Sequence, residues 1–358
     1  MKRFPNQSLL HYNTFGIDQK CDELIVFENE NDAALLASEL HQHTAAGGRL
    51  LLLGGGSNLL LTRDFSGKVV TPEAKFSISV IMEAGTNIPC LKCWAGTTFD
   101  EVVDYAVRHG YYGMENLSLI PGQCGASAVQ NIGAYGAEAK DFISQIEAVE
   151  IATGRIVHFT QADCHYSYRQ SRFKNEWKNR YLITYVTYRL SRKFEPLLDY
   201  GNIRSKLSEA HISVEHLTAQ QLRDTIIEIR QEKLPDPAVT GNAGSFFMNP
   251  IIDEETFRKL KERVPDLHYF RVDARGEAIC NDEAPRNCRY KIPAGWMIER
   301  CGWKGKSLGC AGVHGKQALV LINRGGATGH DMVNLMQAIQ RDVKATFGLE
   351  IHPEVNVI

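Results

Sequence analysis

The chain has 358 residues, of which 44% are hydrophobic and 23% charged, and its formal net charge is −2 at pH 7. This composition is typical of a globular protein with two or three domains. The small net charge gives no basic field for nucleic acid or an anionic membrane, and no apolar run of about 18 residues or more predicts a membrane span.

The N-terminal residues and the cysteines favour a cytoplasmic protein. MKRFPNQSLLHYNTFG has two basic residues but no apolar run long enough for a signal peptide. The nine cysteines are scattered and odd in number, which is typical of a reduced protein. Cys90 and Cys93 form a CxxC inside a strand-like stretch without a second ligand pair at zinc spacing, so we expect no metal site.

The first part of the chain alternates predicted strands and helices. LIVFEN at 24–29 is typical of a strand, and Asn31 and Asp32 are cap candidates for the helix AALLASELHQH. A buried strand within 49–61 then runs into a glycine turn.

Two further helices are predicted from capping boxes. The first, TTFDEVVDYAVRHG, begins with Thr98 and Glu101, and the second, TAQQLRDTIIEIRQEKLPDP, begins with Thr218 and Gln221. The residues expected on their buried faces are Val102, Val103, Ala106 and Val107 in the first and Leu222, Ile226 and Ile229 in the second.

The second half of the chain is richer in predicted strands. QIEAVEIATG, RIVHFTQ and YLITYVTYRL, between 145 and 190, alternate with the period of two that indicates strands. AGSFFMN and ALVLIN are strand candidates within 241–329, and a last helix, HDMVNLMQAIQRDVKATFG, ends at Gly348. The fold class is therefore α+β, with several small sheets.

A glycine turn follows the second predicted strand. It contains Gly54, Gly55, Gly56, Ser57 and Asn58. The Rossmann fingerprint is not met, because its third glycine position falls on Leu59, and no Walker lysine follows. Two interpretations remain open: a backbone nest for a phosphate, and a tight turn between strands.

A second loop, NLSLIPGQCGASAVQNIGAYGAE at 116–138, is also rich in small residues. They include Gly122, Gly125, Ala126, Ser127 and Gly133. Small residues let a ligand approach the backbone closely. Two such loops in one domain suit an extended ligand with a pyrophosphate, so we expect a large flavin-type ligand such as FAD.

AGSFFMNP at 243–250 places Ser245 between a glycine and two phenylalanines. A serine hydroxyl is a poor acid and a poor nucleophile unless its surroundings activate it. Taken alone, this stretch favours a turn beside a strand.

The two glycine loops together resemble the UDP-N-acetylenolpyruvoylglucosamine reductase family. The similarity runs from NTFGI at 13–17 to HPEVNVI at the C-terminus. It implies non-covalent FAD, NADPH as the source of hydride, and reduction of the enolpyruvyl group of UDP-N-acetylglucosamine enolpyruvate to give UDP-N-acetylmuramate for peptidoglycan.

The resemblance also implies a domain organisation. Two FAD-binding subdomains of the vanillyl-alcohol-oxidase type are expected at 1–66 and 67–232. A C-terminal α+β substrate-binding domain is expected at 233–329, with 330–358 returning to the first subdomain.

Three short motifs resemble those that carry the family's catalytic residues. SFFMNP is similar to the motif of the proton donor, which makes Ser245 the candidate acid. YSYRQSRFK resembles the motif of the catalytic arginine and places it at Arg169, and HPEV places the acidic residue at Glu354. Many relatives have lysine where this chain has Met248, so we assign no charged role there.

Four further residues are expected at the substrate. The resemblance points to Tyr200 in DYGN, as in the family members with this extra loop, to Lys233 in KLPDP and to Asn249 in the NP dipeptide. Arg230 precedes Lys233 on the same predicted helix and is a weaker candidate for the diphosphate.

These residue types suit the implied chemistry. Addition of hydride to the vinyl carbon moves negative charge onto the substrate carboxylate, which Arg169 can grip with two hydrogen bonds. Ser245 would then deliver a proton, with Lys233 as a nearby cation. Glu354 is either protonated by burial or orients Arg169 or a water, and the sequence leaves both roles open.

Two other functions compete with the reductase. A flavin oxidase of a sugar or hydroxy acid would use oxygen and ignore NADPH, and a silent flavin-binding scaffold would show no substrate-dependent oxidation of its flavin. The presence of Arg169, Ser245 and Glu354 in their motifs argues against the scaffold, and no comparable set supports the oxidase. As partners we expect the two substrates alone, with no nucleic acid and no membrane, and the protein is expected to be a monomer.

Overall fold

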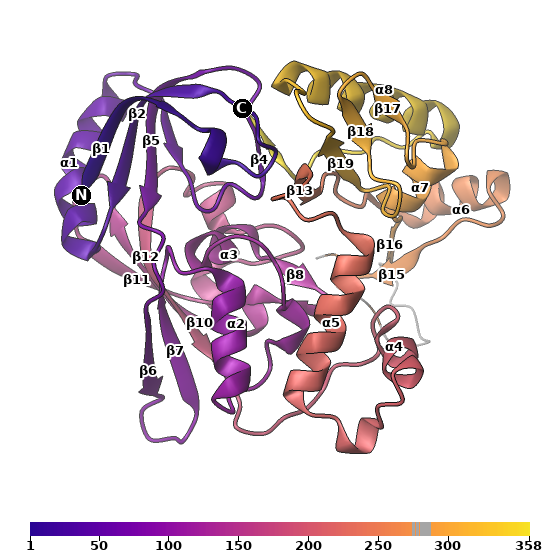
Figure 1. Ribbon diagram of the computed structural model, residues 1–358, viewed down its shortest axis with the longest axis horizontal. Coiled ribbons are helices and arrows are strands. Elements are labelled where there is room, and N and C mark those ends of the chain that lie inside the picture. The colour runs from indigo at the N-terminus through magenta and orange to yellow at the C-terminus, as the bar shows by residue number, and fades with distance from the viewer. Residues whose placement is uncertain (274–275, 277–278, 280–287) are drawn as a thin grey trace. The chain divides into compact units, whose positions relative to one another are not determined.

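The computed structural model describes residues 1–273, 276, 279 and 288–358, and Figure 1 shows its ribbon. The described chain divides into two compact units. The first consists of Met1–Gln7, Lys20–Gly56 and Phe65–Glu232, and the second of Ser8–Gln19, Ser57–Asp64 and Lys233–Ile358. Each unit is therefore assembled from separate stretches of sequence. The further division of the first unit at residues 66 and 67 stays a prediction.

The first unit begins with a four-stranded sheet in the order β1-β2-β5-β3, in which β5 pairs in parallel with β2 and β3. The strands are β1 Lys2–Ser8, β2 Lys20–Phe27, β5 Phe65–Pro72 and β3 Leu50–Leu52. Helix α1 (Glu30–Ala45) begins after Asn29, whose side chain accepts a 2.9 Å hydrogen bond from the Asp32 N–H. The expected cap at Asn31 or Asp32 is wrong, because both residues already lie in the first turn and the extended Asn29 precedes it.

A five-stranded antiparallel sheet, in the order β11-β10-β12-β7-β6, completes the scaffold of the first unit (Figure 1). Its strands are β11 Ile156–Thr160, β10 Ile143–Glu150, β12 Tyr181–Arg189, β7 Pro89–Trp94 and β6 Ile78–Met82. The strands expected between 145 and 190 are thus confirmed. Helix α1 packs its apolar face, which includes Leu36 and Leu40, against side chains from the four-stranded and the five-stranded sheet.

Helices α2 (Phe99–Arg108) and α3 (Cys124–Gln130) contribute to the core of the five-stranded sheet. All four residues expected on the buried face of α2 are buried. The predicted capping box is wrong, because the Thr98 side chain caps no N–H. Thr98 instead forms a β-bridge with Gln123, and the first N–H of the helix, on Phe99, donates to the Gly122 carbonyl.

Helix α5 (Ala219–Lys233) is capped as expected. Gln221 accepts at Oε1 from the Thr218 N–H at 2.9 Å, and the Gln221 N–H donates to the Thr218 hydroxyl at 3.2 Å. Its three predicted apolar residues are buried with the side chains of α4 (Ile203–Glu209). A short bidentate pair with Asp100 holds the buried Arg223 at 2.6 and 3.0 Å.

The second unit contains three small sheets among its described residues. One runs in the order β13-β19-β18-β17, one in the order β14-β16-β15, and the last pairs β20 with β4. The strands are β13 Gly241–Ser245, β19 Val320–Asn323, β18 Ala311–Val313, β17 Ser307–Leu308, β14 Ile251–Ile252, β16 Arg289–Lys291, β15 Phe270–Val272, β20 Asn356–Val357 and β4 Leu59–Leu60.

Three helices cover these sheets: α6 Glu254–Arg263, α7 Ala294–Arg300 and α8 Gly329–Phe347. Helix α8 begins in a capping box of Thr328 and Asp331 and ends, as expected, at Gly348, which has a left-handed φ of 73°. Among the described residues, the short 3-10 helices are Leu10–Tyr12, Glu115–Leu117, Ala139–Asp141, Ala162–Cys164, Arg172–Lys174 and Val214–His216. None of the described helices is long and apolar enough to cross a bilayer.

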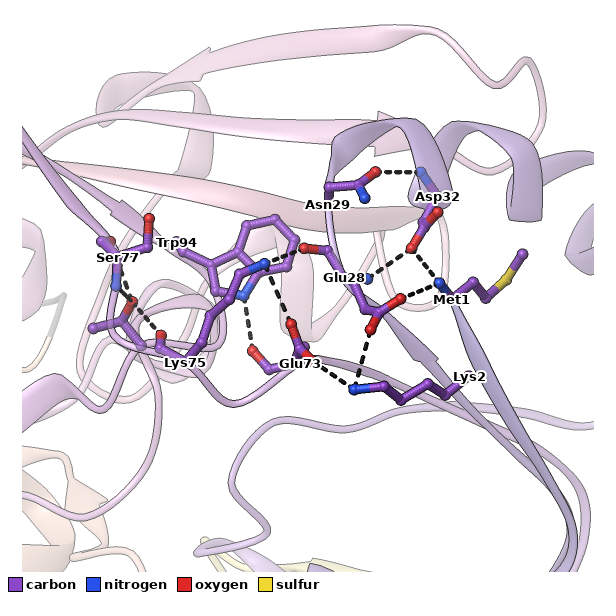
Figure 2. Close-up of polar contacts among 10 residues, drawn as sticks. Met1, Lys2, Glu28, Asn29, Asp32, Glu73, Lys75, Ser77 and Trp94 are labelled. Carbon is purple, nitrogen blue, oxygen red and sulfur yellow. Dashed lines mark hydrogen bonds and ion pairs between the residues drawn. The ribbon is translucent and has the colours of Figure 1, made fainter.

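An ion-pair network ties the start of β1 to α1 and to the segment after β5 (Figure 2). Lys2 pairs with Glu73 at 2.7 Å and with Glu28 at 3.1 Å, and the Glu73 carbonyl accepts from the Trp94 indole at 2.8 Å. Hydrogen bonds from the Met1 amine and then from Lys2 lower the pKa of Glu28 to about 2. Each exposed pair contributes little alone, but the network fixes the edge of the sheet.

Candidate functional site

The two predicted glycine loops meet inside the first unit. A Cβ added to Gly54 would lie 3.0 Å from the Cβ of Ala126, and one added to Gly55 would lie 3.2 Å from the Cα of Gly122. Both distances are tighter than ordinary carbon contacts, so a larger side chain would push the loops apart. The small residues are therefore needed for the backbones to approach, which is the arrangement expected of a cofactor cradle.

Two buried side-chain oxygens in these loops have no hydrogen-bond partner within the part of the chain that the structure describes. They are Oε1 of Gln123 and Oε1 of Gln130. Gln123 Oε1 would lie 3.5 Å from a Cβ on Gly54, so it belongs to the junction of the loops. Buried amide oxygens are nearly always hydrogen-bonded. FAD carries N–H and O–H donors, and the residues present therefore fit this cofactor.

Two of the expected cofactor residues have packing roles in the structure. The hydroxyl of the buried Ser127 lies 2.7 Å from the Cys124 carbonyl and 2.7 Å from the Tyr188 hydroxyl. A Cβ on Gly125 would lie 3.0 Å from the Cβ of Ala95. Contacts of these two residues with a cofactor stay predictions.

Arg169 occupies a strained turn in the first unit. The backbones of Ser167 and Gln170 exchange two hydrogen bonds, of 3.2 and 3.0 Å, across a turn made by Tyr168 and Arg169. Arg169 has a φ of 57°, in the left-handed region that costs an ordinary residue about 1–2 kcal/mol. Strain of this kind concentrates at functional sites, where the surrounding structure holds it.

Carbonyl groups of the second glycine loop hold the Arg169 guanidinium. Nη2 donates to the Gly133 carbonyl at 2.6 Å, and Nη1 donates to the Asn131 carbonyl at 3.2 Å. Nη1 also lies 3.7 Å from Glu138 Oε1, and the Arg169 side chain is 17% exposed. The arginine is therefore fixed against the loop that is expected to bind the flavin.

A hairpin in the same loop places Tyr135 against Tyr200 and within electrostatic range of Arg230. Strands β8 (Gly133–Ala134) and β9 (Ala137–Glu138) are joined by Tyr135 and Gly136, which both have positive φ, of 47° and 84°. The Tyr135 and Tyr200 rings meet edge-on at 6.5 Å. Burial lowers the pKa of Arg230, against the opposing effects of Tyr135 and Asp100. The sequence did not single out Tyr135, although its place in an AYG turn was a signal.

Ser245 and Glu354 lie on neighbouring backbones in the second unit. Exposed Ser245 ends β13 just after Gly244, whose φ of 67° marks a bulge in the pairing with β19. The chain then pairs with the C-terminal segment: the Glu354 N–H donates to the Phe246 carbonyl at 2.8 Å. Asn58 Nδ2 donates to the Glu354 carbonyl at 3.3 Å, which adds an expected cofactor residue to this neighbourhood.

The remaining expected substrate residues also belong to the second unit. Asn249 Oδ1 accepts a 2.8 Å hydrogen bond from the N–H of Ala294, the first residue of α7, so this side chain satisfies a helix N-terminus. Lys233 is the last residue of α5. Their contacts with substrate stay predictions.

Comparisons with known proteins agree with the motifs. Residues 236–358 match the model of the UDP-N-acetylenolpyruvoylglucosamine reductase C-terminal domain, and residues 24–160 match that of an FAD-binding domain. The UDP-N-acetylenolpyruvoylglucosamine reductase of Bacteroides fragilis (strain YCH46) is 44% identical over 355 residues, covering 98% of each chain. That of Burkholderia ambifaria (strain ATCC BAA-244) is 42% identical over 355 residues, covering 98% of this chain and 95% of its own.

A solved structure shares the fold. The crystal structure of UDP-N-acetylenolpyruvylglucosamine reductase from Thermus caldophilus superposes with a TM-score of 0.64 at 20% identity, over 99% of this chain and 98% of that one. The expected fold class, an FAD-binding domain with a C-terminal α+β domain, is confirmed. The chain belongs to the UDP-N-acetylenolpyruvoylglucosamine reductase family and is an FAD-dependent oxidoreductase.

Proposed function

We propose that the chain reduces the enolpyruvyl group of UDP-N-acetylglucosamine enolpyruvate to give UDP-N-acetylmuramate, a precursor of peptidoglycan, with NADPH as the reductant. The observation that carries this proposal is the sequence identity of 44% to the UDP-N-acetylenolpyruvoylglucosamine reductase of Bacteroides fragilis, over 98% of both chains. Arg169 of the YSYRQSRFK motif supports it, because the reaction needs a fixed cation and two carbonyl groups hold this guanidinium in place.

FAD would be held where the two glycine loops meet, by the backbones of Gly54, Gly55 and Gly122 and by the amide oxygens of Gln123 and Gln130. When bound, the flavin supplies hydride transfer from NADPH to the substrate. The loops position the cofactor through close backbone approach, which larger side chains would prevent.

Arg169 binds the carboxylate of the enolpyruvyl group. Its guanidinium stays charged at any physiological pH and neutralises the negative charge that develops on the substrate. The hydrogen bonds to the Asn131 and Gly133 carbonyls fix its orientation before the substrate arrives, so little reorganisation is needed during reaction.

Ser245 delivers the proton from its Oγ to the substrate carbon. Its place at the exposed end of β13, beside a bulge, leaves the hydroxyl accessible to a ligand. Lys233 stabilises the alkoxide that the transfer leaves. Glu354 acts either as a neutral acid or as a residue that orients Arg169 or a water, and both roles stay open.

Tyr200, Arg230, Lys233 and Asn249 recognise the rest of the substrate. A common neighbourhood of the first two is supported by Tyr135, whose ring meets that of Tyr200 and which acts electrostatically on Arg230. We further propose that the protein works as a cytoplasmic monomer without nucleic acid as a partner.

Anaerobic turnover tests this function. The purified holoprotein is mixed with NADPH and UDP-N-acetylglucosamine enolpyruvate, and the product is identified by mass spectrometry. A product heavier by two hydrogens, formed in equal amount to the NADPH consumed, is expected. Formation of peroxide in air from a sugar or hydroxy acid, without use of NADPH, would favour the flavin oxidase instead.

A further inference from the structure

We propose that Glu138 is a positioning residue, which holds the Arg169 guanidinium in the orientation needed for the substrate carboxylate. The inference rests on the proposed role of Arg169. It assigns to Glu138 a role that acts through the arginine and not on the reacting atoms. The two residues are 31 positions apart in sequence, and the hairpin of β8 and β9 brings them together.

The first observation is the place of Glu138 on that hairpin. Glu138 pairs directly with Gly133, the residue whose carbonyl accepts from Arg169 Nη2. The carboxylate has several partners. Oε1 lies 3.7 Å from Arg169 Nη1, and Oε2 accepts from Asn131 Nδ2 at 2.8 Å and lies 3.4 Å from Lys140 Nζ. The side chain also accepts from the Asp141 N–H, in the capping box of the 3-10 helix Ala139–Asp141. The Glu138 side chain is 22% exposed, so water screens these contacts only partly.

The second observation is that Asn131 links the hairpin to the turn that carries Arg169. Buried Asn131 donates from Nδ2 to the Ser167 carbonyl at 3.1 Å as well as to Glu138, and its own carbonyl accepts from Arg169 Nη1. Its φ of 46° is again in the left-handed region. The carboxylate therefore fixes both the guanidinium and the side chain that ties down the Arg169 turn.

The third observation concerns charge and space. The Glu138 carboxylate lies between two cations, with Oε1 3.7 Å from Arg169 Nη1 and Oε2 3.4 Å from Lys140 Nζ, so removing it takes away a negative charge that attracts both. A Cβ on Gly133 would lie 2.9 Å from both Arg169 Nη1 and Glu138 Cγ, so the three groups are packed together without spare volume. The two carbonyls and the carboxylate thus form a preformed site for one guanidinium.

Glu138→Ala and Glu138→Gln holoproteins test the role in catalysis. We expect NADPH to reduce the flavin at the wild-type rate, and the substrate-driven oxidation of the reduced flavin to slow about 10- to 100-fold in Glu138→Ala. Glu138→Gln can still accept from Asn131 but lacks the charge, so its rate of substrate-driven flavin oxidation should lie between those of wild type and Glu138→Ala. Glu195→Ala removes an exposed carboxylate that pairs with Lys193 and serves as the matched control.

Chemical rescue separates positioning from a purely structural effect. In Arg169→Ala, added guanidinium should restore substrate-driven flavin oxidation with saturation, because the site for the ion is still present. In Arg169→Ala/Glu138→Ala, half-saturation should need about tenfold more guanidinium. The inference would be overturned if guanidinium rescued Arg169→Ala and Arg169→Ala/Glu138→Ala equally, or did not rescue Arg169→Ala at all. A rate of substrate-driven flavin oxidation in Glu138→Ala within twofold of wild type would also overturn it.

Separate experiments test the proposed function and the role of Glu138. A wild-type protein whose reduced flavin is not oxidised by the substrate would contradict the function itself. Guanidinium binding to the two Arg169→Ala proteins, measured by calorimetry without substrate, still tests Glu138. Tighter binding where Glu138 is present supports its role, and equal binding contradicts it.

Discussion

Arg169 Nη2 and the carbonyl of Gly133 are joined by a 2.6 Å hydrogen bond, although the two residues are 36 positions apart in the chain. The glycine allows this approach, because an added Cβ would lie 2.9 Å from Arg169 Nη1 and 2.8 Å from the Ala137 carbonyl. Besides its place in the loop expected to bind FAD, Gly133 therefore leaves room for the Arg169 guanidinium, the proposed catalytic cation.

Gly133→Ala should displace this cation. We expect substrate-driven flavin oxidation to slow about 10- to 100-fold, because a misplacement near 1 Å costs that much in a positioned site. Stopped-flow absorbance measures the rate. Gly315→Ala is the matched control, since a Cβ there would meet nothing within 4 Å. Equal rates in the two variants would show that the guanidinium does not depend on this contact.

Ser245→Ala removes the proposed proton donor. NADPH should still reduce the flavin at the wild-type rate, while its oxidation by the substrate should slow by about 100-fold or more, which is typical for loss of a general acid. Ser79→Ala, at another exposed serine that ends no bulged strand, is the control. If the second half-reaction of Ser245→Ala kept its rate, the acid role would be wrong.

Gly55→Val should weaken binding of FAD. The valine Cβ would lie 3.2 Å from the Gly122 Cα, so the two loops must separate, and overpacking of this kind corresponds to about tenfold or more in affinity. The ratio of flavin to protein absorbance after dialysis measures the loss. Gly315→Val should keep its full flavin content, and so should Gly55→Val if the loops do not hold the cofactor.

Stability at acid pH should depend on Glu39. A hydrogen bond from Arg3, together with one from Lys68 and against the opposing effect of burial, lowers the pKa of Glu39 to about 2. A carboxyl with a pKa lowered by folding contributes stability that is present above its unfolded pKa, near 4.5, and is lost as the pH falls towards 2. This part of the free energy of unfolding is at most about 1 kcal/mol, since the Glu39 side chain is 38% exposed.

Urea unfolding of Glu39→Gln from pH 7 to pH 2 checks this contribution. The midpoint should lie below that of wild type at pH 7, and the difference should shrink below pH 4.5 and vanish near pH 2. Glu101→Gln, at an exposed position on α2, is the control. A difference that is the same at every pH would rule out the electrostatic explanation.

Local signals predicted the parts of the fold that depend on neighbouring residues. The capping box of Thr218 and Gln221 starts α5, and α8 ends at the glycine expected to stop it. The expected box at Thr98 failed because a distant segment, at Gln123, pairs with the backbone there. Long-range pairing of this kind has no signature in a single sequence.

The same distinction applies to the candidate site. Glycine-rich composition predicted both loops, and motif resemblance predicted Arg169, Ser245 and Glu354. Gln123 and Glu138 were not found, because each is defined by contacts formed only after folding: a buried amide oxygen at the meeting of two loops and a carboxylate opposite Gly133. The left-handed φ of Arg169 likewise becomes visible only in three dimensions.

The substrate-driven oxidation of the reduced flavin tests the central claim most directly. The holoprotein is reduced anaerobically with one equivalent of NADPH and mixed with UDP-N-acetylglucosamine enolpyruvate, while absorbance is followed in the flavin band. The account predicts rapid return of the oxidised spectrum without oxygen. A flavin that stays bleached until air is admitted would contradict it and favour an oxidase.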